Sequence, residues 1–316
     1  MRPRAEPVKH TPHMPPRTAP LKPPAQKPLL GMGYMMASGL TNQAMNGMIR
    51  ITAALGVHPF EIAFFRCLFG TILLAGMLAG PGLGALRTRR PSLHLARAVL
   101  NATSMLSFFL ALTIEPLAKL SALMFTSPLF AALGATLFLR ERMGLARAAG
   151  LAFGFGGALI VMRPGGEPMT LGLWLAMLAA ATWGAALVLI KLQSRTESSL
   201  TIAIYAALLL LPLNGAGALF FWSWPSLEML AWMAGIGVCG TLGQIALGNA
   251  FRAADATVVL PFDFTKLIWA AGVGYLLFGE VPDIWTWTGG TVIFASSLFM
   301  AYRERAARKA LPIPAE

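Results

Sequence analysis

Two residues of opposite charge, Asp263 and Lys266, stand in a long apolar stretch of the sequence. An ionised side chain at the centre of a bilayer costs about 2.5–3.5 kcal/mol on insertion scales, so each one needs a partner or a function. Their spacing of three residues places them on one face of a helix, where they can neutralise each other. Two interpretations stay open. The pair locks its helix to a neighbouring helix, or it faces a cavity where Lys266 meets a carboxylate and Asp263 an ammonium group of a zwitterionic substrate.

Other polar and aromatic residues could complete such a cavity. Trp269 shares the face of the charged pair and could stack on a ring or a cation. Asn42 and Asn46 are one helical turn apart, which suits either a cavity or a hydrogen bond between helices. Gln244 has the same two interpretations. Trp183 lies in the middle of another apolar stretch, where packing is the simpler explanation.

Two arginines also fall inside apolar stretches. Arg66 lies too deep to reach the membrane surface easily, so it either pairs with Glu61, five residues earlier, or binds an anion. Arg97 lies closer to the end of its stretch and is expected to extend its side chain to the surface. Asn101 follows Arg97 at i+4 and is a further candidate for the cavity.

The composition shows what must position these residues. Hydrophobic residues make up 56% of the 316 residues and charged residues only 12%, with mean hydropathy +0.65. A soluble domain carries about 25% charged residues, so most of this chain must be solvated by lipid. We therefore predict an all-α integral membrane protein. Ten segments reach the length needed to cross a bilayer, at about 29–50, 59–79, 94–114, 117–139, 144–162, 169–191, 199–221, 226–250, 256–278 and 284–302.

The distribution of basic residues predicts the orientation. If the N-terminus is inside, the inner segments hold nineteen Lys and Arg residues and the outer segments three. This positive-inside bias places both termini in the cytoplasm of a bacterial inner membrane and accounts for the net charge of +12 without nucleic acid. Residues 1–28, rich in proline and basic residues, are expected to form a disordered cytoplasmic tail, and 303–316 a second basic tail. The true start could be Met1 or Met14.

A repeat relates the two halves of the chain. A shift of 139 positions aligns residues 111–163 with 250–302, and places Phe125-Thr126 on Phe264-Thr265, Glu141 on Glu280 and Gly150 on Gly289. A unit of five helices is odd in number, so the second copy must be inverted in the membrane. Inverted repeats build alternating-access transporters, whose substrate site lies near the midplane where the halves meet.

These residues resemble a known family. The stretches FEIAFFR (60–66), LARAVLNATSMLSFFLALTIEPLAKLSALMFTSPLF (95–130), GLAFGFGGALIVMRPGG (150–166) and PFDFTKLIWAAGVGYLLFGEVPD (261–283) are similar to the EamA domain of the drug/metabolite transporter superfamily. The resemblance implies ten helices and secondary transport, with one EamA-like unit over 29–163 and a second over 169–302. The first half is closest in pattern to S-adenosylmethionine uptake carriers, and riboflavin carriers and metallophore exporters share much of it.

Other motifs support no separate function. Residues 235–240 fit GxGxxG, but they lie inside an apolar segment, where glycines serve close helix packing. The four histidines have no metal-ligand spacing, and no HExxH, GxSxG or Walker A motif is present, so we expect no enzyme, metal or cofactor. We predict a transporter of a small amino-acid-like or S-adenosylmethionine-like zwitterion. A lipid flippase or an exporter of another metabolite is the alternative, and proton coupling, counter-substrate exchange and homodimer formation stay open.

Overall fold

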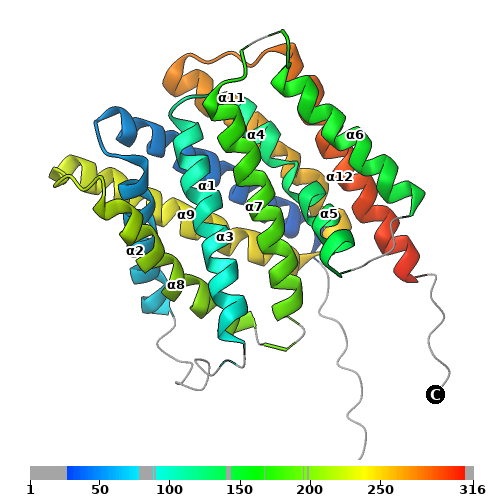
Figure 1. Cartoon of the computed structure of the whole chain (residues 1–316), viewed down its shortest axis with the longest axis horizontal. Coiled ribbons are helices and arrows are strands. Elements are labelled where there is room, and N and C mark those ends of the chain that lie inside the picture. Colours follow the sequence, from blue (N-terminus) through cyan, green and yellow to red (C-terminus); the bar gives the residue numbers. More distant parts are fainter. Residues whose placement is uncertain are drawn as a thin grey trace, which may run out of the picture.

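The computed structural model describes residues 27–77, 88, 90–139, 144–166, 168–194, 196–197 and 199–309, and nearly all of these residues are helical (Figure 1). Residues 1–26 of the predicted tail over 1–28, residues 310–316 and Glu141 lie outside the described residues, and Pro28 at the end of that predicted tail already belongs to a helix. The helices are α1 (Pro28–Ala54), α2 (Pro59–Met77), α3 (Pro91–Leu112), α4 (Leu117–Met124), α5 (Ser127–Leu139), α6 (Leu145–Met162), α7 (Leu171–Gln193), α8 (Ser199–Leu219), α9 (Leu227–Ala253), α10 (Ala256–Val259), the 3₁₀ helix η2 (Leu260–Phe264), α11 (Thr265–Phe278) and α12 (Ile284–Lys309).

Helices occupy every segment predicted to span a membrane, but two of those segments are broken. The segment 117–139 holds α4 and α5, joined by a turn at Phe125 and Thr126, and Leu117–Phe138 as a whole is long and apolar enough to span a membrane. The segment 256–278 holds α10, η2 and α11. The helix α12 also continues past residue 303 to Lys309, which places the start of the predicted second tail inside a helix.

The two breaks have the same local chemistry. The hydroxyl of Thr126 donates a hydrogen bond to the carbonyl oxygen of Leu123 at 2.7 Å, and the hydroxyl of Thr265 donates to that of Phe262 at 2.7 Å. A proline near each break, Pro128 or Pro261, removes a backbone donor. In each break the same carbonyl oxygen also accepts the backbone N–H of that threonine, so the hydroxyl and the amide of one residue share one acceptor.

Side chains fix where several of the helices begin. Thr170 and Ser226 cap α7 and α9, because each side-chain oxygen accepts a hydrogen bond from a backbone N–H three residues later. Asp283 does the same for α12, accepting from the backbone N–H of Thr286 at 2.8 Å. Pro28 and Pro91 start α1 and α3, at the position where the missing N–H has no cost.

The helices pack in pairs that cross between the two halves of the chain. α1 packs against α9 and α11, α3 against α7 and α8, and α6 against α12 at one edge of the bundle (Figure 1). The α6–α12 pair is close because glycines face each other. A Cβ atom on Gly157 would lie 2.9 Å from the carbonyl oxygen of Gly289, so the two backbones are in contact there.

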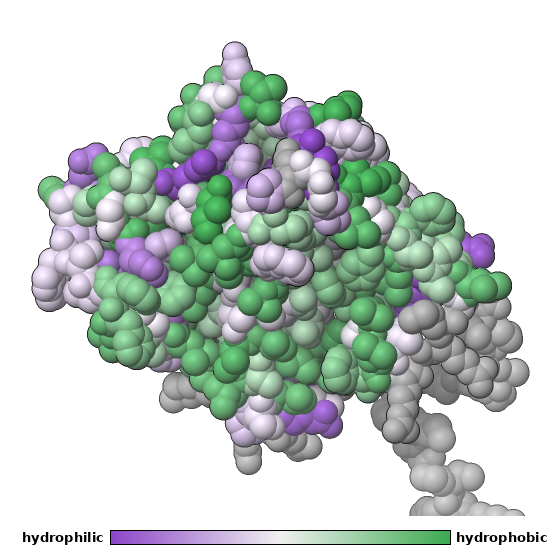
Figure 2. Space-filling model, turned by 45° about the horizontal axis from the view of Figure 1, so that its top comes forward, coloured by the Kyte–Doolittle hydropathy of each residue, from purple (hydrophilic) through white to green (hydrophobic). Residues whose placement is uncertain are grey.

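The surface fits a lipid environment. Within the described residues, six helices are long and apolar enough to cross a membrane, and the apolar segment Ile204–Leu219 of α8 is shorter. Large apolar side chains are exposed around the bundle, such as Phe138, Phe220 and Trp224, and a soluble protein rarely leaves that much apolar surface in water. Figure 2 shows hydrophobic residues across the middle of the displayed face. The count of ten spans stays a prediction.

Candidate functional site

The predicted charged pair forms an ion pair at the junction of two helical segments. Asp263 lies in η2 and Lys266 in the first turn of α11, with Nζ and Oδ1 2.5 Å apart, and both side chains are about one-quarter exposed, at 22% and 25%. The pair therefore spans the break in the helix rather than lying on one continuous helix. Trp269, on the next turn of α11, has an indole N–H that is buried without a hydrogen-bond partner among the described residues.

A glycine on α1 brings this group close to the rest of the bundle. A Cβ atom on Gly39 would lie 3.1 Å from Cγ of Lys266 and 3.3 Å from Cδ1 of Trp269, so both side chains lie directly against the α1 backbone. A larger residue at Gly39 would require the side chains of Lys266 and Trp269 to shift. Gly39 thus lets α1 contact the ion pair and the tryptophan together.

The next turns of α1 carry the predicted asparagines. Asn42 donates from Nδ2 to the carbonyl oxygen of Ser38 at 2.8 Å and lies against Gly243 of α9. Asn46 is buried and donates from Nδ2 to Oε1 of Gln43 at 3.0 Å, while its own Oδ1 accepts no hydrogen bond from the described residues. Asn46 therefore has an acceptor available for a ligand.

Arg66 of α2 does not form the ion pair with Glu61 that its spacing allowed. The carboxylate of Glu61 instead accepts hydrogen bonds from the backbone N–H and the hydroxyl of Ser223, at 3.3 and 3.0 Å. Arg66 lies against Gly240 of α9, one turn from Gly243. Asn42 and Arg66 thus pack against α9 at two glycines one helical turn apart, Gly243 and Gly240.

The structure does not link every candidate to this group. Asn101 of α3 and Trp183 of α7 are half-buried and Gln244 of α9 is exposed. Within the described residues, no hydrogen bond joins any of the three to the charged pair or to Arg66. Their role in binding stays a prediction.

The predicted outer end of the bundle holds a polar cluster that sequence reasoning missed. Glu280, between α11 and α12, forms a short ion pair with Arg50 of α1 and accepts a hydrogen bond from the backbone N–H of Leu117 at 3.0 Å. Arg50 also lines a cavity of about 520 Å³ with His58 and Thr113. Burial lowers the pKa of His58, although Glu61 works to raise it. This cavity does not include the charged pair of α11.

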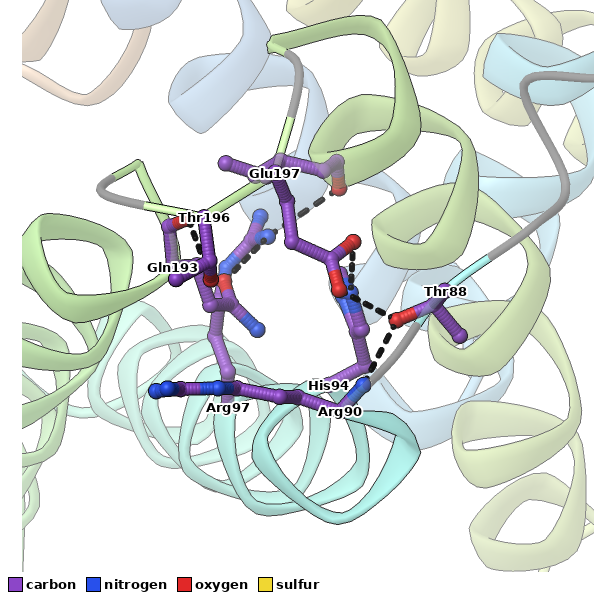
Figure 3. A network of polar contacts seen from close by, with 8 residues as sticks. Thr88, Arg90, His94, Arg97, Gln193, Thr196 and Glu197 are labelled. Carbon is purple, nitrogen blue, oxygen red and sulfur yellow. Dashed lines mark hydrogen bonds and ion pairs between the residues drawn. The ribbon is translucent and has the colours of Figure 1, made fainter.

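The predicted inner end holds a second network, which ties α3 to α7, α8 and the loop between α7 and α8 (Figure 3). His94 lies 3.0 Å from Oε2 of Glu197, and the hydroxyl of Thr88 contacts the same carboxylate at 2.5 Å. Arg97 is buried and donates to Oε1 of Gln193 at 3.4 Å and to the carbonyl oxygen of Ile202 at 3.1 Å. The sequence position of Arg97 predicted that its side chain extends to the membrane surface, and this is wrong. Acceptors inside the bundle satisfy the guanidinium, so the side chain stays buried.

Comparisons with known proteins bear on this arrangement. The sequence profile of the EamA-like transporter family matches residues 29–163 and 170–302. A riboflavin transporter of Rhizobium johnstonii is 34% identical over 87% of this chain and 92% of its own length. An S-adenosylmethionine uptake transporter of Rickettsia bellii is 30% identical, over 88% and 95%. The pseudopaline exporter CntI of Pseudomonas aeruginosa is 30% identical, over 86% and 97%. The similar proteins thus include an uptake transporter and an exporter.

Proposed function

This chain belongs to the EamA-like transporter family, and on that premise we propose that it moves a small zwitterionic organic metabolite across the bacterial inner membrane by alternating access. The observation that carries the proposal is the ion pair of Asp263 and Lys266, which lies at a helix break and against the α1 backbone. A zwitterion can replace both halves of such a pair, with its carboxylate on Lys266 and its ammonium group on Asp263. Charge inside the membrane then stays balanced with and without substrate.

The other groups near the pair fit the same substrate. The buried indole N–H of Trp269 and the buried Oδ1 of Asn46 are a donor and an acceptor that have no partner among the described residues. A buried polar group without a partner costs free energy, and a ligand that supplies the partner recovers it. Asn42, Asn46, Arg66, Trp269 and the charged pair therefore form the proposed site, with Asn101, Trp183 and Gln244 as further candidates.

The packing of the helices supports two inverted halves of five spans each. Let the first half be α1, α2, α3, α4 with α5, and α6, so that α1 corresponds to α7, α2 to α8 and α3 to α9. Replacing each helix by its counterpart then converts the α1–α9 contact into the α7–α3 contact. The same exchange converts α2–α9 into α8–α3 and α1–α11 into α7–α5, and all of these contacts are present. A rocking motion of one half against the other would expose a site between them to each side in turn.

Transport of a different class of molecule is the alternative. A flippase for lipids or lipid carriers, or an exporter of a metallophore or of riboflavin, could use the same fold. The charged pair favours the zwitterion, because a lipid chain or an uncharged ring system offers no group to replace either member. Protons or a counter-substrate could supply the driving force, and a carboxylate at the break, Asp263, is the group suited to carry a proton.

The experiment that tests the proposal is uptake into proteoliposomes of labelled S-adenosylmethionine, phenylalanine and riboflavin. We expect saturable uptake of a zwitterion by the native protein and its loss in the Asp263→Ala/Lys266→Ala double variant. The matched control is the Arg163→Ala/Asp283→Ala double variant, which removes a second ion pair at the predicted outer end. We expect this control to keep its uptake. Saturable uptake by the Asp263→Ala/Lys266→Ala variant would show that this ion pair serves helix packing and does not bind the substrate. Uptake of riboflavin alone would contradict a zwitterionic substrate.

A further inference from the structure

The guanidinium of Arg66 lies in the interior of the bundle with sulfur, not oxygen, as its partner. Its Nη1 contacts Sδ of Met105 on α3 at 3.2 Å, and its Nε is buried without a hydrogen-bond partner among the described residues. On the α9 side it lies against Gly240, where a Cβ atom would lie 3.2 Å from Nε of Arg66 and 2.9 Å from Sδ of Met45. The half-buried side chain of Arg66 thus lies beside the thioether of Met105 and the thiol of Cys67, and it meets Gly240 next to the thioether of Met45.

Several other cations of the described residues have oxygen partners. The paired cations of the described residues include Arg50 with Glu280, Arg163 with Asp283 and Lys266 with Asp263, and Arg97 has two oxygen acceptors. A thioether is a weak acceptor, while a guanidinium carries five donors in a planar fork. Most of the hydrogen-bonding capacity of Arg66 is therefore unused.

The nearest carboxylate along the helix does not pair with Arg66. Glu61 is fully buried; its Oε2 accepts two hydrogen bonds from Ser223, between α8 and α9, and its Oε1 has no partner among the described residues. Asp263 is held by Lys266. Within the described residues no carboxylate forms an ion pair with Arg66, so its charge is balanced by nothing that the described chain supplies.

We propose that Arg66 binds an anionic group of the transported molecule, a carboxylate or a phosphate, at a subsite between α1, α2, α3 and α9. This rests on the proposed transport function and narrows the substrate to compounds that bear such a group. A carboxylate or a phosphate can accept two parallel hydrogen bonds from the fork of an arginine, which neither thioether can do. A side chain at position 240 would meet the guanidinium and Sδ of Met45, so Gly240 leaves the space beside the guanidinium open.

The first test measures thermal stability and needs no knowledge of the substrate. Met105→Glu places a carboxylate within reach of Arg66, so we expect its melting temperature in detergent to rise above that of the native protein. Arg66→Met removes an unpaired charge and should also raise it. Met105→Gln, which has the size of glutamate without its charge, is the matched control and gives no rise. A fall in melting temperature for both Met105→Glu and Arg66→Met would overturn the proposal, because it would show that Arg66 is already satisfied.

The second test uses uptake in proteoliposomes of the compounds named above. We expect Arg66→Met to raise the KM for S-adenosylmethionine or phenylalanine at least tenfold, and Met105→Glu to do the same because its carboxylate occupies the subsite. Phenethylamine, which is phenylalanine without its carboxylate, should fail to compete with either compound. An unchanged KM in Arg66→Met would contradict this subsite, and equal competition by phenethylamine would contradict the carboxylate contacts proposed for both Arg66 and Lys266. If the Asp263→Ala/Lys266→Ala variant keeps its uptake, only the proposed site at the charged pair is contradicted.

Discussion

The rings of Phe125 and Phe264 stack on each other, with centroids 6.1 Å apart and planes at 20°. These two residues are 139 positions apart, which is the shift that aligns the two halves of the sequence. Each lies beside a break in its helix, next to Thr126 or Thr265, whose hydroxyls make the same hydrogen bond. If a two-fold axis relates the two halves, equivalent residues that touch must lie close to it. The two breaks therefore meet at the place where a two-fold axis between the halves would pass.

That arrangement leads to a prediction about orientation. If the second half is inverted, Ser223 between α8 and α9 faces the outside, and Thr196 after α7 faces the cytoplasm. In a background with Cys67 and Cys239 replaced by alanine, we expect a membrane-impermeant maleimide to label Ser223→Cys in intact cells. Thr196→Cys should react only after the cells are opened. The reverse pattern would show that the basic residues do not set the orientation.

The proposed role of Asp263 predicts how transport depends on pH. If a proton crosses with each substrate, Asp263→Asn should abolish the pH dependence of uptake, because an amide cannot exchange a proton. If transport is plain exchange, the same substitution should weaken binding and leave the shape of the pH profile unchanged. Initial uptake rates between pH 5 and 8, with and without an imposed pH gradient, distinguish the two mechanisms.

The contact of α6 with α12 predicts opposite results for two neighbouring glycines. A Cβ atom on Gly157 would clash with the backbone of Gly289, so Gly157→Ala should destabilise the protein by about 1–3 kcal/mol. A Cβ atom on Gly156 meets nothing within 4 Å, so Gly156→Ala is the matched control and should cost nothing. Thermal unfolding in detergent measures both. Equal stability of the two variants would mean that the helices do not touch at Gly157.

The ion pair of Asp283 and Arg163 predicts a dependence of stability on pH. Partial burial works to raise the pKa of Asp283, but hydrogen bonds from Thr286 and the charges of Arg163 and Lys119 outweigh it and lower that pKa below its ordinary value. A carboxylate with a lowered pKa stabilises the folded state above its ordinary pKa and loses this effect as the pH falls through its lowered value. Asp283→Asn should therefore melt below the native protein at pH 7.

The melting temperatures of the two proteins should converge as the pH falls below about 4, the ordinary pKa of an aspartate. Unfolding in detergent followed from pH 7 to pH 3 makes this comparison. Glu228→Gln, which removes an exposed carboxylate from the first turn of α9, is the control. A constant difference between Asp283→Asn and the native protein over that range would assign the effect to lost packing instead of charge.

Much of the fold could be predicted because it follows from local properties of the chain. Lipid requires each span to be apolar and to satisfy its own backbone, so hydropathy alone places the helices to within a few residues. The helix breaks were missed because proline is tolerated at the start of a helix, and the sequence does not show whether a helix continues across Pro128 or restarts there. The spacing of Asp263 and Lys266 similarly predicted that they could pair, and they do.

The sequence by itself thus determined a membrane protein of the EamA-like transporter family and the charged residues that its interior must accommodate. Only the tertiary structure decided which of these charges are paired, because the partners come from other helices. Glu61 is five residues from Arg66 and yet binds Ser223, while Arg66 faces Met105. Arg50 finds Glu280 across 230 positions of sequence. Charge balance inside a membrane depends on contacts between helices, which sequence spacing does not contain.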